Sequence, residues 1–240
     1  MPNPFFQFKQ FVVQQDQCAM KVSTDSCLFG AWLSKKIIPS LPDISQVLDI
    51  GSGTGLLMLM MAQEHAFHID GIELDEAAYR QALSNIESTP WKDRLQLFHG
   101  NVNMFEFSRS YDLVISNPPF YEHDLLPNSK EKASAMHATT LTFEDLLKAV
   151  DENLSPGGFC AFLIPYRRLD HFAHLAISKG FYLHNVVHVR HQTDHDMIRS
   201  MILFGRNQAE TKTEILTIKE ADGSYTSSFV HLLQAYYLYL

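Results

Sequence analysis

The strongest indication of the fold of this chain is the stretch Val47-Leu48-Asp49-Ile50-Gly51-Ser52-Gly53-Thr54-Gly55. A short apolar run ends in glycines at alternate positions, which let a backbone turn sharply and lie against a ligand. The spacing is GxGxG rather than the GxGxxG of dinucleotide-binding folds, and no phosphate-loop lysine follows. The pattern predicts a strand and then a turn that favours a nucleoside over a phosphate chain. A plain strand-to-helix turn is the structural alternative.

Strand-like and helix-like segments alternate on both sides of this stretch. We expect helices over residues 26–36, 56–64, 75–86 and 141–154 and strands over residues 47–50, 67–74, 95–98, 113–115, 159–164, 185–190 and 197–204. This alternation predicts one α/β domain: a seven-stranded, mostly parallel sheet that ends in an antiparallel hairpin, with helices on both faces. The hairpin loop, residues 191–196, should overlook the active site, and the aromatic tail, residues 229–240, should form a closing helix.

Composition sets the broad class. The chain has 240 residues, 46% hydrophobic and 19% charged, which is typical of one globular domain. The longest apolar run, residues 56–62, is too short to span a bilayer, and no secretory signal is visible at the start. Three scattered cysteines fit a reducing compartment. We therefore expect a cytoplasmic protein, and a monomer.

Charge is unevenly distributed. The formal net charge is -8, which does not favour a nucleic-acid partner. Residues 41–116 hold four Lys and Arg against eleven Asp and Glu, whereas residues 117–208 hold nine against ten. The acidity is thus concentrated around the predicted nucleoside site, and a local basic face elsewhere is compatible with the total.

Polar side chains at the predicted strand ends are candidates for cofactor binding. Glu73 ends the second strand, where a carboxylate can accept hydrogen bonds from both ribose hydroxyls. Asp75 is better interpreted as a helix N-cap. Asp49 can hold a cofactor amino group or anchor the glycine loop, and Asn101 can contact an adenine edge or form a turn. The predicted set comprises Asp49, Gly51, Gly53, Gly55, Glu73, Leu74, Asn101 and Val102.

The tetrapeptide Asn117-Pro118-Pro119-Phe120 follows the fourth predicted strand and is the candidate catalytic motif. An exocyclic amine is a poor nucleophile because its lone pair is delocalised into the ring. Two acceptors, the Asn117 side-chain oxygen and the Pro118 carbonyl, can hold its hydrogens and favour a pyramidal nitrogen. Phe120 offers a stacking face, worth about 1–3 kcal/mol, for a base that is unpaired or flipped out.

Together these residues resemble class I methyltransferases of the type that modifies amino groups. The stretches Phe8-Lys9-Gln10-Phe11, Met20-Lys21-Val22-Ser23-Thr24-Asp25 and Gly30-Ala31-Trp32 narrow the resemblance to the bacterial tRNA1(Val) (adenine-37-N6)-methyltransferase family. The resemblance covers about residues 6–205. It implies a Rossmann-like fold, S-adenosyl-L-methionine as methyl donor and an anticodon-loop adenine of tRNA as acceptor. No metal is implied.

The resemblance also implies roles for further residues. Lys21, Thr24 and Asp25 would line the cofactor pocket, although Thr24 and Asp25 can also cap the helix over residues 26–36. Residues 1–45 would form an extension over the cofactor site, residues 46–205 the core sheet and residues 206–240 a C-terminal extension. Asn101 stands where the family commonly has an acidic residue. The candidate RNA contacts are Lys9, Lys130, Lys132, Arg167, Arg168, Arg190 and Arg199.

Several alternatives stay open at this point. N5-glutamine methylation of a protein uses a similar motif, but usually with Tyr where this chain has Phe120 and with a larger N-terminal domain. Guanine-N2 methylation of ribosomal RNA and adenine methylation of DNA are further possibilities, as is a non-catalytic RNA-binding scaffold. The spacing of His188, His191 and His195 can suggest a metal site, but we interpret them as surface or RNA-facing groups.

Overall fold

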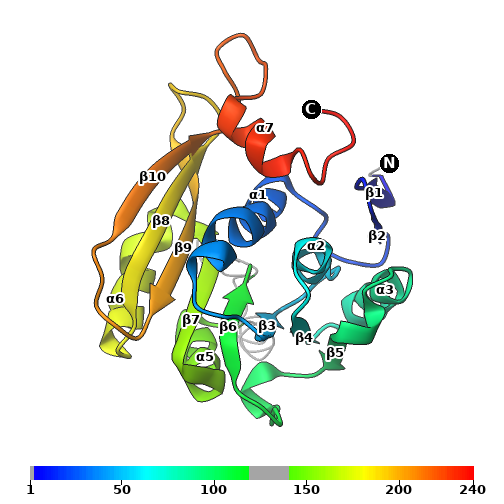
Figure 1. Ribbon diagram of the computed structural model, residues 1–240, viewed down its shortest axis with the longest axis vertical. Helices are drawn as coiled ribbons and strands as arrows, with labels where there is room; N and C mark the ends of the chain where they lie inside the picture. Colours follow the sequence, from blue (N-terminus) through cyan, green and yellow to red (C-terminus); the bar gives the residue numbers. More distant parts are fainter. Residues whose placement is uncertain (1–2, 119–140) are drawn as a thin grey trace, which may run out of the picture.

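A computed structural model describes residues 3–118 and 141–240 of the chain. Its centre is an eight-stranded sheet in the order β10-β8-β9-β7-β6-β3-β4-β5 (Figure 1). The strands are β3 (Gln46–Ile50), β4 (His68–Glu73), β5 (Leu95–His99), β6 (Tyr111–Ser116), β7 (Leu154–Pro165), β8 (Tyr182–Arg190), β9 (Met197–Gly205) and β10 (Lys212–Thr217). All neighbours pair in parallel except β7 with β9 and β8 with β9, so the predicted antiparallel hairpin is confirmed.

Helices cover both faces of this sheet. They are α1 (Thr24–Trp32), α2 (Leu56–Glu64), α3 (Glu76–Glu87), α5 (Phe143–Asn153), α6 (Leu169–Ser178) and α7 (Ser227–Leu233). Successive strand residues serve opposite faces, as the pleat requires: Val47 belongs to the core under α1 and α2, and Leu48 to the core under α5 and α6. Residues 56–62 of α2 are all buried, which explains why that helix is apolar on every side.

The number of strands differs from the expected seven. The additional strand, β10, pairs in parallel with β8 at the edge of the sheet. Its sequence, Lys-Thr-Glu-Ile-Leu-Thr, is mostly polar, and residues 212–215 are exposed. An edge strand with so little buried surface lacks the hydrophobic pattern by which the other seven were predicted.

The two ends of the described chain also depart from expectation. The predicted closing helix over residues 229–240 is wrong in extent, because α7 ends at Leu233. The chain then turns, and the Tyr236 hydroxyl donates to the Met60 carbonyl at 3.2 Å. Near the start, β1 (Phe5–Gln7) and β2 (Val12–Gln14) form a small antiparallel sheet, and Phe8 pairs with Tyr237. Within the described ranges, every helix is too short or too polar to cross a membrane.

Candidate active site

The candidate residues gather where the parallel strands end. Strand β3 ends at Ile50, β4 at Glu73, β5 at His99 and β6 at Ser116. Because Ile50 pairs with Ser116, the glycine loop and Asn117 leave adjacent strands at the same level. The carboxyl edge of a parallel sheet is where ligands bind in such folds. The loop of residues 191–196 joins β8 to β9 at this edge, since Arg190 pairs with Met197 and Pro165 with Arg199.

The glycine loop has the geometry that its sequence requires. Gly51, Gly53 and Gly55 have φ angles of 74°, 56° and 79°, which side-chain-bearing residues rarely adopt. A Cβ atom built on Gly51 or Gly53 would meet no atom within 4 Å, so the loop borders open space. The Gly51 and Ser52 amides donate to the Ile72 carbonyl at 2.9 and 3.2 Å, which ties the loop to β4. The structure thus holds an open, fixed turn.

Glu73 connects the glycine loop to the start of α3. Its Oε2 accepts a hydrogen bond from the Gly53 amide at 2.8 Å, and its Oε1 accepts one from the Asp75 amide at 2.9 Å. Each oxygen keeps a lone pair, and the side chain is only half-buried. Asp75 accepts from the Ala78 amide at 2.8 Å, so its predicted N-cap role is confirmed. The Glu73 carboxylate is oriented in advance and can accept from ligand hydroxyls.

Asp49 is the unusual group of this edge. Its side chain is wholly buried, and within the described part of the chain neither carboxylate oxygen has a hydrogen-bond partner. Burial, together with the negative charge of Glu73, raises the pKa of Asp49 to about 8. A buried carboxylate without donors is destabilising unless a ligand supplies them. The Ser52 hydroxyl bonds to the Asp49 main-chain carbonyl at 3.0 Å, and its closeness to the carboxylate partly offsets the rise in the pKa of Asp49.

Asn101 has the turn role that the sequence left open. Its side-chain oxygen accepts from the Asn103 amide at 3.0 Å and caps the short helical turn Val102–Met104. Val102 is buried and Leu74 is exposed beside this turn. The Gly100 amide donates to the Glu73 carbonyl at 2.9 Å, which places the two strand ends together. Contact of Asn101 with an adenine ring stays a prediction.

The N-terminal segment is joined to the glycine loop through α3. The Gln14 amide donates to Asn85 Oδ1 at 2.9 Å, and Asn85 Nδ2 donates to the Thr54 carbonyl at 3.0 Å. The Gln17 amide donates to Gln81 Oε1 at 2.8 Å. Sequence reasoning missed Gln81 and Asn85; the available signal was two polar residues four apart on the helix face that also carries Ala78 and Ala82.

Lys21 and Asp25 both engage protein partners. The Lys21 ammonium donates to the Gln15 carbonyl. Asp25 Oδ2 forms an ion pair with Arg199 Nε at 2.9 Å, across the contact between α1 and β9. The expected capping role of Thr24 and Asp25 is wrong: Ser23 is the N-cap, so both residues lie in the first turn of α1. The residue that caps a helix is set by backbone dihedrals, and three successive polar residues left the sequence ambiguous.

Asn117 is held by α1. Its Nδ2 donates to the Ser26 hydroxyl oxygen at 3.0 Å, and among the described residues its Oδ1 has no hydrogen-bond partner. The preceding Ser116 hydroxyl donates to the Ile50 carbonyl at 2.7 Å, which fixes the strand end against β3. Pro118 is buried. Pro119 and Phe120 lie outside the described residues, as do Lys130 and Lys132.

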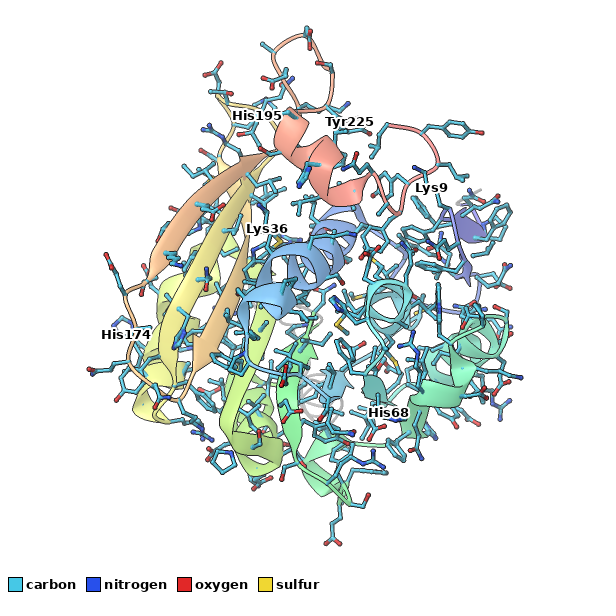
Figure 2. The ribbon with its side chains drawn as sticks, in the orientation of Figure 1. Lys9, Lys36, His68, His174, His195 and Tyr225 are labelled. Carbon is cyan, nitrogen blue, oxygen red and sulfur yellow. The ribbon has the colours of Figure 1, made fainter. Side chains whose placement is uncertain are left out.

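The remaining basic candidates do not form one uniform group. Arg167 and Arg168 are exposed in the helical turn Tyr166–Arg168 that follows β7 at the carboxyl edge. Arg190 donates to Thr217 Oγ1 at 2.9 Å and to the Thr193 carbonyl at 2.6 Å. Lys9 donates to the Gln234 carbonyl at 2.6 Å, on the C-terminal segment and far from the hairpin loop that carries His195 (Figure 2).

The histidines of the hairpin are separated from one another. His188 Nδ1 lies 3.0 Å from the Ser200 hydroxyl, and burial lowers the pKa of His188. The Tyr166 ring meets the His188 ring edge to face at 5.0 Å, whereas His191 and His195 are exposed. Over residues 3–118 and 141–240, no three His, Cys, Asp or Glu side chains are grouped as a metal would require.

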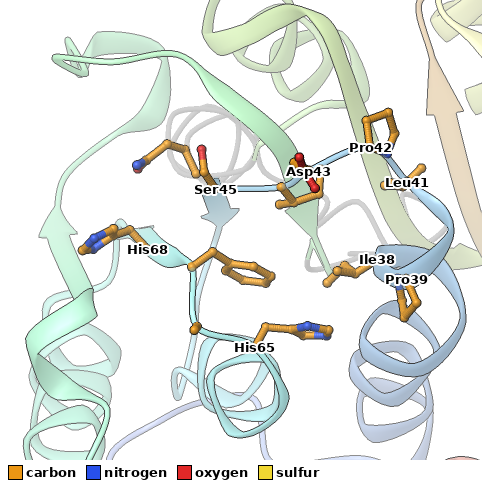
Figure 3. Close-up of a pocket in the computed structure, with 12 residues that line it drawn as sticks. Ile38, Pro39, Leu41, Pro42, Asp43, Ser45, His65 and His68 are labelled. Carbon is orange, nitrogen blue, oxygen red and sulfur yellow. The ribbon is translucent and has the colours of Figure 1, made fainter.

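A hollow of about 640 Å³ lies at the opposite edge of the sheet, between the starts of β3 and β4 (Figure 3). Apolar side chains such as Ile38, Leu41 and Phe67 line it together with His65 and His68. His65 Nε2 is already bonded to the Ser34 carbonyl at 3.0 Å. None of the candidate residues lies in this hollow.

Comparison with known proteins agrees with this geometry. The family model described as "Methyltransferase small domain" matches residues 31–175. A tRNA1(Val) (adenine(37)-N6)-methyltransferase of Dyadobacter fermentans is 41% identical over 98% of both chains. A predicted O-methyltransferase of Agrobacterium tumefaciens superposes with a TM-score of 0.65 over 88% of this chain and 96% of its own, at 14% identity. A glycopeptide N-methyltransferase solved with S-adenosylmethionine has a TM-score of 0.54 over 74% of this chain and 94% of its own, at 12% identity.

The two structural likenesses concern the fold alone, and they confirm the predicted methyltransferase architecture. The sequence likeness extends over nearly the whole length of both chains, which a shared fold by itself does not produce. This chain therefore belongs to the family of tRNA1(Val) (adenine(37)-N6)-methyltransferases.

Proposed function

We propose that this protein transfers a methyl group from S-adenosylmethionine to N6 of an adenine in tRNA, at position 37 of tRNA1(Val). Relatives that carry this name match the chain over nearly its full length. The observation that carries the chemistry is the Asn117 carboxamide: its Nδ2 is bound to Ser26, and its Oδ1 has no hydrogen-bond partner among the described residues. Asn117 follows β6, which pairs with the strand that leads into the glycine loop.

The carboxyl edge fits S-adenosylmethionine, which supplies a methyl group on a positively charged sulfur. Asp49 would accept from the amino group, since no described residue donates a hydrogen bond to its buried oxygens. Glu73 would accept from the ribose hydroxyls, and the open side of Gly51 and Gly53 would lie against the nucleoside. Leu74, Asn101 and Val102 would surround the adenine.

The N-terminal segment would cover this cofactor. Its links to Gln81 and Asn85 place residues 14–17 against α3 and the glycine loop. Lys21, Thr24 and Asp25 would line the same space, with Asp25 oriented by its ion pair with Arg199. In this scheme residues 1–45 are an extension over the cofactor, residues 46–205 the core and residues 206–240 a second extension.

The acceptor amine would be held by Asn117 Oδ1 and the Pro118 carbonyl. Both groups accept hydrogen bonds, so they favour the amine geometry in which the nitrogen lone pair is localised. No ionisable base is needed for this step, because the nitrogen gains positive charge as the methyl arrives and then loses a proton to solvent. Stacking of the base on Phe120 stays part of the proposal.

The RNA would approach along the ends of β7 and β8 and the start of β9. Arg167 and Arg168 are exposed there, and the hairpin loop stands beside them. Lys9, Arg190 and Arg199 already bind protein groups and would contribute less, and Lys130 and Lys132 complete the predicted set. A cytoplasmic location and a monomeric state belong to the same proposal.

The test is methyl transfer to bulk tRNA lacking the modification, followed by nucleoside analysis. We expect N6-methyladenosine in tRNA and no methylated guanine. Label recovered on a protein glutamine, or as N2-methylguanosine in ribosomal RNA, would assign the chain to another amine. Isothermal titration with S-adenosylmethionine separates a non-catalytic scaffold, which would show no binding.

A further inference from the structure

We infer that Ser26 is a positioning residue: its hydroxyl holds the Asn117 carboxamide with Oδ1 towards the acceptor amine. The inference rests on the proposed function for its catalytic meaning. Ser26 lies in the first turn of α1, far from Asn117 in sequence, and its side chain is buried. The contact joins the helix that follows the N-terminal segment to the strand end that carries the candidate motif.

The hydrogen bonds around Ser26 form a chain. Asn117 Nδ2 donates to Ser26 Oγ at 3.0 Å, and Ser26 Oγ lies 2.7 Å from Ser23 Oγ. Ser23 Oγ also accepts from the Ser26 amide at 3.3 Å, as the cap of α1. When the Ser26 hydroxyl donates its hydrogen bond to Ser23 Oγ, the lone pairs of Ser26 Oγ face the side-chain amide hydrogens of Asn117.

This arrangement determines which end of the carboxamide faces outward. A carboxamide has a donor end and an acceptor end of nearly the same shape, so a neighbour must fix its orientation. An acceptor at Ser26 binds the nitrogen and leaves Oδ1 for the hydrogens of the substrate amine. If Ser26 instead donated to Oδ1, the amide hydrogens would face the amine and oppose its binding.

The first experiment is a double-mutant cycle in single-turnover methylation of tRNA. Ser26→Ala should lower the rate about tenfold, the effect of losing one buried hydrogen bond in the transition state. The affinities for S-adenosylmethionine and tRNA should stay within about twofold, because Ser26 only orients Asn117. In the Asn117→Ala background, Ser26→Ala should have almost no further effect. Ser26→Thr, which keeps the hydroxyl, should recover most of the rate.

Ser34→Ala is the matched control, since Ser34 is another buried serine in the helical segment that continues α1. It should leave the rate unchanged. An unchanged rate in Ser26→Ala would overturn the inference. So would an equal loss with and without Asn117, which would indicate a general packing effect.

A second measurement does not depend on activity. The side-chain amide signals of Asn117 can be assigned by nuclear magnetic resonance from their loss in Asn117→Ala. In Ser26→Ala they should shift and exchange faster with solvent, whereas Ser34→Ala should leave them unchanged. If they do not respond, the inference fails even if tRNA is methylated. If they respond but the wild type produces no N6-methyladenosine, the contact exists and the proposed function fails.

Discussion

The amino and carboxyl edges of the central sheet differ in how their polar side chains are hydrogen-bonded. The amino edge holds a hollow of about 640 Å³, and several polar groups near it are hydrogen-bonded within the protein. Asp112 Oδ2 accepts from the Ser45 amide and hydroxyl, both at 2.9 Å, and from the Gln46 amide at 3.0 Å. Among residues 3–118 and 141–240, the Asp49 carboxylate at the carboxyl edge is buried without a donor and the Asn117 side-chain oxygen has no hydrogen-bond partner.

Among the described residues, the candidate site at the carboxyl edge is marked by Asp49 and Asn117, whose side-chain oxygens keep unmet hydrogen-bonding capacity. A buried polar group without a partner lowers stability, so its presence in a folded protein calls for a ligand. The positive φ angles of the glycine loop point to the same edge.

The largest effect is expected at Asn117. Asn117→Ala removes an acceptor that acts mainly in the transition state, so the rate of methyl transfer should fall about 10²–10³-fold. Binding of S-adenosylmethionine should persist, as isothermal titration would show. Asn207→Ala, at an exposed position after β9, is the control and should keep the wild-type rate. Retained activity in Asn117→Ala would show that the Asn117 carboxamide is not required for methyl transfer.

The next largest effect is expected at Asp49, where a substitution should lower the affinity for the cofactor but raise the stability of the free protein. Asp49→Asn should weaken S-adenosylmethionine binding about 10–100-fold, because a charge-assisted hydrogen bond to an ammonium is lost. The free protein should become more stable at neutral pH, because folding no longer requires the Asp49 carboxyl to take up a proton or to be buried as an ion. Calorimetry measures the affinity and thermal unfolding the stability. Unchanged affinity would show that Asp49 serves the fold alone.

Asp49 also gives the free protein a defined dependence on pH. Its pKa is about 8 in the folded state, against an ordinary value of 3.8, so between these values the folded state binds more protons than the unfolded state. The Asp49 contribution to the free energy of unfolding should therefore decrease as the pH rises from about 4 to 8. Comparing denaturant unfolding of the wild type and Asp49→Asn across this range isolates the contribution. A difference that is constant with pH would contradict the expectation.

A smaller effect is expected for the exposed arginines of the carboxyl edge. Replacing Arg167 and Arg168 together by alanine should weaken tRNA binding about tenfold and reduce the slope of log affinity against log salt by about 1–2. Cofactor affinity should not change. Binding titrations at several salt concentrations measure the slope. An unaltered slope would exclude these side chains as phosphate contacts.

The smallest effect is expected at the amino edge. Asp112→Ala removes the acceptor of three hydrogen bonds to Ser45 and Gln46, which should lower the free energy of unfolding by about 1–2 kcal/mol. The methylation rate should stay unchanged at a temperature where the variant is folded. A loss of rate here would mean that the two edges do not act separately.

The sequence predicts most of this fold because its signals are local. The turn at Gly51, the buried helix α2 and the N-cap at Asp75 all follow from residues next to one another, and the structure confirms them. Strand β10 was missed because an exposed edge strand carries almost no hydrophobic pattern. Backbone pairing with β8 forms it, and no residue pattern within the segment encodes that partner.

The site was predictable only as a set of candidate residues. The sequence indicates Asp49 and Asn117, but the missing donors of Asp49 and the bond from Asn117 to Ser26 depend on contacts between distant segments. The same applies to Asn85, which links the N-terminal segment to the glycine loop. Such tertiary hydrogen bonds have no counterpart in residue spacing.

The most direct test is to map the binding of S-adenosylmethionine on the backbone amide resonances of the protein. We expect the perturbed amides to lie at the carboxyl edge, in residues 49–55, 73–75, 101–103 and at Asn117, while residues 41–46 and 65–68 around the hollow stay unchanged. Perturbations confined to the hollow, with an unaltered glycine loop, would show that the cofactor does not bind at the carboxyl edge.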